Sequence, residues 1–155
     1  MLIEEIIAHL SKEIEAYEKS ARAAHAEATH EQNKAENKYD TRALEASYLA
    51  HGQSRQAAET AEALQHFQAF SLRAFGPADP IDLGALVKLE ANGEQSFYFI
   101  GPRAGGAEIM HEEGTVLVLT PQSPLGRQLI GKRTGDRLKI ELGGVRNEYR
   151  VAAVT

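Results

Sequence analysis

The sequence predicts an α+β protein with two domains: an N-terminal antiparallel α-helical coiled-coil hairpin and a C-terminal antiparallel sheet with one short helix. Three observations predict this fold class. Residues 1–75 contain no proline and a single glycine, Gly52, and their apolar side chains recur at heptad spacing. Two prolines and a glycine follow within residues 76–80. Beyond them, short segments rich in β-branched, aromatic and aliphatic residues alternate with Gly and Asn turns, as in a small sheet.

Composition narrows the classes of function. The chain has 155 residues, of which 43% are hydrophobic and 25% charged, as in globular proteins. It has no cysteine, which excludes disulfides, thiol catalysis and cysteine-ligated zinc or iron–sulfur sites. A net charge of −5 and the absence of tryptophan argue against a protein that binds a nucleic-acid backbone by itself.

The sequence gives no sign of a membrane or secretory segment. No apolar run reaches the roughly 20 residues that a membrane helix needs. The start MLIEEIIAHL carries glutamates where a secretory signal would carry lysines. We therefore expect a cytoplasmic protein with no membrane partner.

The first helical arm begins near the N-terminus and carries one apolar stripe. Its members alternate steps of four and three, the spacing that faces a partner helix: Ile3, Ile7, Leu10, Ile14, Tyr17, Ala21 and Ala24. A polar stretch at residues 29–34 interrupts the pattern, and its Thr29 and Asn33 are residue types that favour caps and turns. The first arm is therefore expected to end at this stretch.

The second arm restarts the same pattern after the polar stretch. Its stripe consists of Ala43, Ala46, Ala50, Ala57, Leu64 and Phe67. Two heptad arms joined by a short turn most simply fold back on each other, which predicts a hairpin over residues 1–75 with its tip at about residues 29–36. We expect a monomer, although dimerisation through the same stripe would give the same periodicity.

A linker is expected at residues 76–81, and a sheet domain at residues 82–155. Five strands are expected, at residues 85–89, 95–100, 115–120, 137–142 and 148–151. Between the third and fourth, residues 123–132 read S-P-L-G-R-Q-L-I-G-K. A serine cap, a proline at the first helical position and a glycine after the last apolar pair predict one short helix there.

This last motif carries a family resemblance. Residues 123–132, followed by Gly135-Asp136, a strand and the closing Glu148-Tyr149-Arg150-Val151, resemble the C-terminal domain of the Gre (GreA/GreB) transcript-cleavage factors of bacterial RNA polymerase. At the hairpin tip, Glu36-Asn37 followed by Gly52 resembles a second family motif. The resemblance covers essentially the whole chain and implies an FKBP-like fold for the C-terminal domain.

The resemblance also implies a function. Gre factors bind RNA polymerase, insert the coiled coil into its secondary channel and bring acidic tip residues to the catalytic Mg²⁺ site, where backtracked RNA is cleaved. The chain would then be an accessory factor and not an enzyme, with no cofactor of its own and with Mg²⁺ held by the polymerase. It would reach the RNA 3′ end only within that complex.

The tip departs from the family pattern at one position. The pattern D-x-x-E-N is here Asn33-Lys34-Ala35-Glu36-Asn37, so Glu36 matches and the other acid is replaced by a neutral amide. Glu31 and Asp40 are candidates to compensate, since Asp40 follows Glu36 by four residues on the same helical face. The same acids also suit a solvated helix start, and Asn33 also suits a turn cap.

Three functional interpretations remain open. The first is a cleavage-promoting elongation factor, and the second is a Gre-fold regulator that occupies the channel without cleavage because of Asn33. The third is a coiled-coil adaptor with another protein partner. For polymerase docking, the family places the contact on the C-terminal domain, which makes Ser123, Pro124 and Leu125 the candidates.

Overall fold

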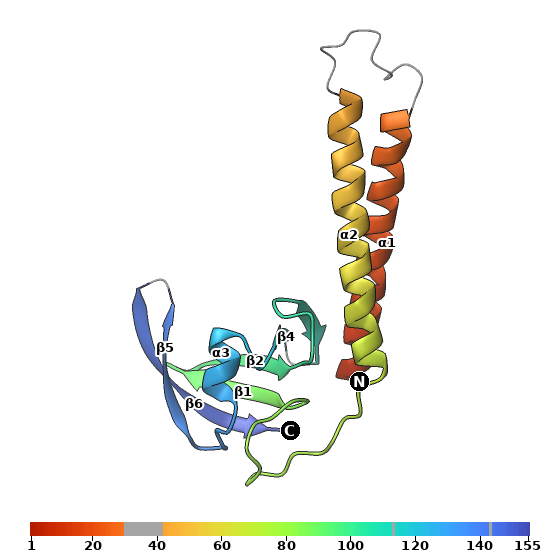
Figure 1. Ribbon diagram of the computed structural model, residues 1–155. Helices are drawn as coiled ribbons and strands as arrows, with labels where there is room; N and C mark the ends of the chain where they lie inside the picture. The colour runs from red at the N-terminus through yellow and green to blue at the C-terminus, as the bar shows by residue number, and fades with distance from the viewer. Residues whose placement is uncertain (30–41, 113, 143) are drawn as a thin grey trace. The chain divides into compact units, whose positions relative to one another are not determined.

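The computed structural model describes residues 1–29, 42–112, 114–142 and 144–155 (Figure 1). By their contacts, they form two compact units. One is Ile7–Gln65, and the other combines Met1–Ile6 with His66–Thr155. The domain boundaries expected at residues 75 and 82 stay predictions. None of the helices in these described ranges is long and apolar enough to cross a membrane.

The N-terminal half is a pair of long helices, as predicted. Helix α1 spans Leu2–Thr29 and α2 spans Arg42–Gln68, and Figure 1 shows them side by side. Most of the predicted stripe is buried or half-buried in its described part. Ile6 is also fully buried, although it lies outside the predicted stripe.

The buried residues of the helices change in size along the arms. Leu10 is buried in the first part of α1, whereas Ala21 and Ala24 are buried near its end. On α2, Ala46, Ala50 and Ala57 are buried in the first two thirds. Small side chains let helix backbones approach closely, and a larger side chain at such a position would force the helices apart.

The C-terminal half is one six-stranded sheet in the order β3-β4-β2-β1-β6-β5. Its strands are β1 (Leu86–Ala91), β2 (Glu94–Ile100), β3 (Glu108–His111), β4 (Gly114–Leu119), β5 (Arg137–Leu142) and β6 (Val145–Val154). The β1–β2 hairpin turns at Asn92-Gly93, where both residues have positive φ, as a two-residue hairpin turn requires. The predicted α+β class is confirmed.

The sheet differs from the prediction in two ways. Strand β3 was not expected, because four residues without alternation carry no periodic signal. The sheet is mixed instead of antiparallel throughout: β2 and β4 are parallel, with Phe97 opposite Val116. Strand β3 causes this, because it runs back along the edge and pairs antiparallel with β4.

One face of the sheet is closed by helix α3 (Pro124–Leu129). The core under it contains Ala85, Val87 and Leu89 around β1, together with Leu129 from the helix, all at 0% exposure. After the helix, the backbone of Ile81 donates to Lys132 O at 2.7 Å and accepts from Gly131 N at 2.9 Å. Helix α3 is therefore fixed at its end by the segment that enters the sheet.

Candidate functional sites at the hairpin tip and on the sheet domain

The predicted tip residues follow the first arm and precede the second in the sequence. Glu31, Asn33, Glu36 and Asp40 all fall within residues 30–41, outside the described residues. The structure describes the helices on either side of them: α1 ends at Thr29 and α2 begins at Arg42. The roles assigned to these four residues stay predictions.

A groove runs between the arms near their tip ends. It is lined by small and polar residues of both helices: Ala21, Arg22, His25, Ala26, Ser47, Ala50, His51 and Ser54. Two histidines face this groove, yet across the described residues no three His, Asp or Glu side chains gather as metal ligands would.

The predicted docking residues sit at the start of α3. Ser123 is its N-cap: Oγ accepts from Gly126 N at 3.1 Å and donates to Thr120 O at 2.8 Å. Its φ of −65° and ψ of 155° are those of an N-cap residue. Leu125 is half-buried and packs against the core, whereas Pro124 is exposed at the first helical turn. Of the three residues, only Pro124 is exposed to solvent.

Gly126 lies where a larger residue would disturb the cap of α3. A Cβ at this position would lie 2.0 Å from Thr120 O and 2.7 Å from Ser123 Oγ, far inside contact distance. The closest clash would be with the same carbonyl that accepts from the cap hydroxyl. The local fold thus accounts for the serine and the glycine at these two positions.

The sheet face opposite α3 holds a cavity of about 250 Å³. Its floor is apolar, with Leu86, Phe97 and Val116, and the Lys88 ammonium lies 5.8 Å from the centre of the Phe97 ring. Ligand pockets are commonly about 300–1,000 Å³, so this one is small. Its lining also includes His111 and Glu112.

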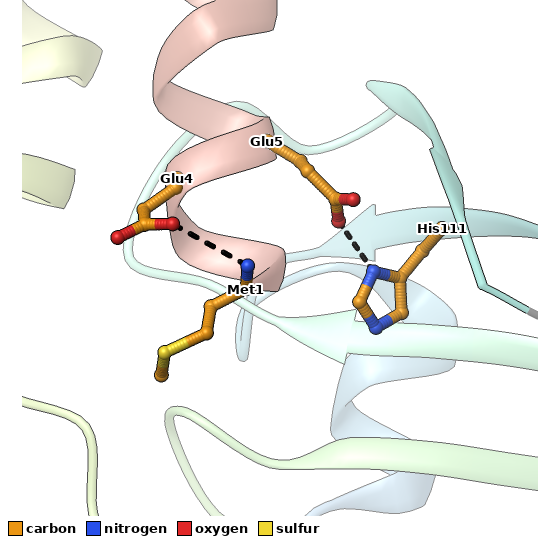
Figure 2. Close-up of polar contacts among 4 residues, drawn as sticks. All are labelled: Met1, Glu4, Glu5 and His111. Carbon is orange, nitrogen blue, oxygen red and sulfur yellow. Dashed lines mark hydrogen bonds and ion pairs between the residues drawn. The ribbon is translucent and has the colours of Figure 1, made fainter.

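A contact between a histidine and a carboxylate joins two segments that are far apart in the sequence. His111 Nδ1 in β3 contacts Glu5 Oε2 in the first turn of α1, as Figure 2 shows; both residues belong to the unit that contains Met1–Ile6 and His66–Thr155. Nearby, the Met1 amine contacts Glu4 at 3.4 Å. His111 is mostly buried, with 16% of its side chain exposed. No spacing rule could link two residues 106 positions apart, one of them in an unpredicted strand.

One family model and several solved structures are similar to this chain. The family model "Transcription elongation factor, GreA/GreB, C-term" matches residues 76–155, just over half of the chain. No curated protein matches. Among solved structures, GreA factor homolog 1 (Gfh1) of Thermus thermophilus is similar at 20% identity and a TM-score of 0.41, over 96% of this chain and 94% of that one.

Two further structures are similar over most of their own length. Gfh1 of Thermus aquaticus has 20% identity and a TM-score of 0.41, over 97% of this chain and 92% of that one. A GreA/GreB elongation factor of Nitrosomonas europaea has 16% identity and a TM-score of 0.39, over 76% of this chain and 95% of that one. The assignment itself rests on the family model. The chain belongs to the GreA/GreB family of transcription elongation factors.

Proposed function

We propose that this chain enters the secondary channel of bacterial RNA polymerase with its hairpin and promotes cleavage of backtracked RNA through acidic residues of the tip. The observation that carries the proposal is the family match over residues 76–155. Membership implies that the chain binds RNA polymerase and acts as an accessory factor. We place it with the polymerase in the cytoplasm.

The helical arms supply the mechanical part of the proposal. A hairpin of two helices of 28 and 27 residues is a stiff support, at about 1.5 Å of length per residue. Residues at its tip can be held deep inside a partner. This suits delivery of side chains to the active site of that partner.

The residue types at the tip suit a contact with Mg²⁺. Magnesium prefers oxygen ligands, and Glu36, Glu31 and Asp40 offer three carboxylates within residues 30–41. A second Mg²⁺ in a two-metal site stabilises the attacking and leaving oxygens. The part of this chain is to bring anionic oxygens to the polymerase's ion and hold them there, with Glu36 as the main donor.

Asn33 favours a second candidate function. At the position where the family has an acid, an amide offers one carbonyl oxygen and no negative charge. A chain with fewer anionic ligands holds a divalent ion less firmly, so it would occupy the channel as a regulator without promoting cleavage. This alternative shares the polymerase contact and differs only in the chemistry of the tip.

A backtracked polymerase complex separates the two functions. With Mg²⁺ and the wild-type protein, we expect the RNA to be shortened from its 3′ end, and Glu36→Ala to reduce the rate by at least about 100-fold while binding is retained. Binding without any shortening would replace the cleavage function by the regulator. Absence of polymerase binding would contradict both.

Asn33→Asp tests the second candidate directly. If the amide limits the natural protein, restoring a carboxylate should raise the cleavage rate by about tenfold or more. Gln32→Asp is the matched control, because it adds the same charge one residue away. Equal gains from both variants would show that general tip charge matters and position 33 does not.

A further inference from the structure

A stripe on the outer face of α2 is unlike the rest of the hairpin surface. Leu44 and Tyr48 are 54% and 69% exposed, and Gly52 continues their four-residue spacing, so the three share one helical face. We call these residues the α2 stripe. At 100° per residue, the stripe points away from the buried Ala46 and Ala50 of the seam.

Helix α1 shows that this exposure is not general. Across the described residues Leu2–Thr29, no large apolar side chain is exposed to this degree. On α2, the stripe also changes beyond Gly52, where the same face carries the ion pair of Arg55 and Glu59 at 3.2 Å. The apolar part is therefore confined to the tip-proximal turns of one helix, and Leu49 beside it is 55% exposed as well.

Gly52 is a second and independent observation. Glycine inside a helix is unfavourable compared with alanine. Here the chain itself gives no reason for it: among the described residues, a Cβ at Gly52 would meet no heavy atom within 4 Å, and its φ lies outside the range that favours glycine. A helix-weakening residue without an internal cause points to a surface that approaches the backbone closely from outside.

We propose that the α2 stripe packs against an apolar protein surface of RNA polymerase that lies beside the path of the tip. The proposal rests on the proposed function, which brings residues 30–41 into the polymerase. Gly52 lies ten residues after the start of α2, or about 15 Å along the helix, so a partner that receives the tip also extends past the stripe on that side of the hairpin.

The chemistry of the stripe selects a protein partner instead of RNA. Phosphates are bound by Lys and Arg, and the stripe offers none. Tyrosine beside an aliphatic residue is typical of buried anchors at protein interfaces. Glycine beside them removes a side chain from the contact and brings the partner closer to the helix.

The first test measures equilibrium binding of the full chain to RNA polymerase. The double variant Leu44→Gln, Tyr48→Gln keeps good helix formers at both positions, and we expect it to weaken binding by about tenfold or more. Gly52→Ala should raise the melting temperature yet weaken binding. Lys19→Gln and Ser20→Ala, at exposed positions of α1, are the matched controls and should leave binding unchanged.

The outcomes separate this proposal from the proposed function. If the double variant and Gly52→Ala both bind like wild type, the stripe proposal is overturned while polymerase binding stands. If the stripe variants bind more weakly than wild type, but Glu36→Ala and wild type are equally inactive in cleavage, the stripe proposal stands and the cleavage function is overturned. If wild type does not bind polymerase, both are overturned.

A photo-cross-link identifies the occupant. Tyr48→p-benzoylphenylalanine should cross-link to a polymerase subunit within the complex, whereas the same residue introduced at Lys19 should not. A cross-link to RNA would overturn the choice of a protein surface. A cross-link to a second copy of this chain, with a dimer of wild type that the double variant abolishes in sedimentation, would overturn the choice of polymerase.

Discussion

The sheet domain and the helical hairpin use their most recognisable residues in opposite ways. In the sheet domain, Ser123 caps α3, Gly126 leaves room for that cap, and Leu129 is fully buried. These residues of the family motif therefore stabilise the fold. In the hairpin, the seam consists largely of alanines, and the residues expected to carry chemistry lie at the tip. A family match through the sheet domain therefore identifies the partner better than the reaction.

The largest effect is expected where the sheet-domain motif is tightest. Gly126→Ala should lower the free energy of unfolding by about 3 kcal/mol, because the new Cβ would lie 2.0 Å from Thr120 O and the backbone there must move. Urea unfolding of the full chain measures it. Unchanged stability would show that the capping turn relaxes freely, contrary to the packing described above.

The same substitution in the hairpin is its matched control. Gly52→Ala should raise stability by about 1 kcal/mol, because the added Cβ has space and alanine favours the helix. One chemical change is thus expected to have opposite signs in the two regions. A loss of stability at Gly52 would contradict the comparison, since it would indicate an internal role for that glycine.

A loss of stability smaller than that of Gly126→Ala is expected in the hairpin seam. Ala57→Leu should cost about 2 kcal/mol, because Ala57 is buried in the seam between the two helices and a larger side chain there must displace its neighbours. The loss of helical circular dichroism with temperature measures it. Ala23→Leu, at an exposed position of α1, is the control and should change stability by less than about 0.5 kcal/mol.

Much of the fold could be predicted from the sequence, and the reasons differ by region. Heptads gave the two helices, and the S-P start with a glycine stop gave α3. Strand β3 and the parallel β2–β4 pair could not be predicted, because four residues carry no period and strand order is a long-range property. The contact of Glu5 with His111 could not be predicted either, because His111 lies in β3, the strand that the sequence did not predict.

For the candidate sites, the sequence supports predictions about residues that the structure does not describe. It predicted the tip acids from a family pattern, and these residues lie outside the described ranges. It also proposed Ser123 and Leu125 for docking, without any means to know that both already serve the fold. The α2 stripe was missed because exposure of Leu44 and Tyr48 depends on how the helices face each other.

The smallest loss of stability tests whether the sheet-domain motif has a second role. Ser123→Ala removes both the acceptor for Gly126 N and the donor to Thr120 O, and should cost about 1 kcal/mol. Ser123→Thr retains a hydroxyl and should restore most of that stability. Polymerase binding by these variants then shows whether Ser123 acts by stabilising the fold or by contacting the polymerase. If Ser123→Thr is stable and binds normally, the serine acts through the cap; if it is stable but binds poorly, the crowded hydroxyl faces the polymerase, and the contrast between the two regions no longer holds at this residue.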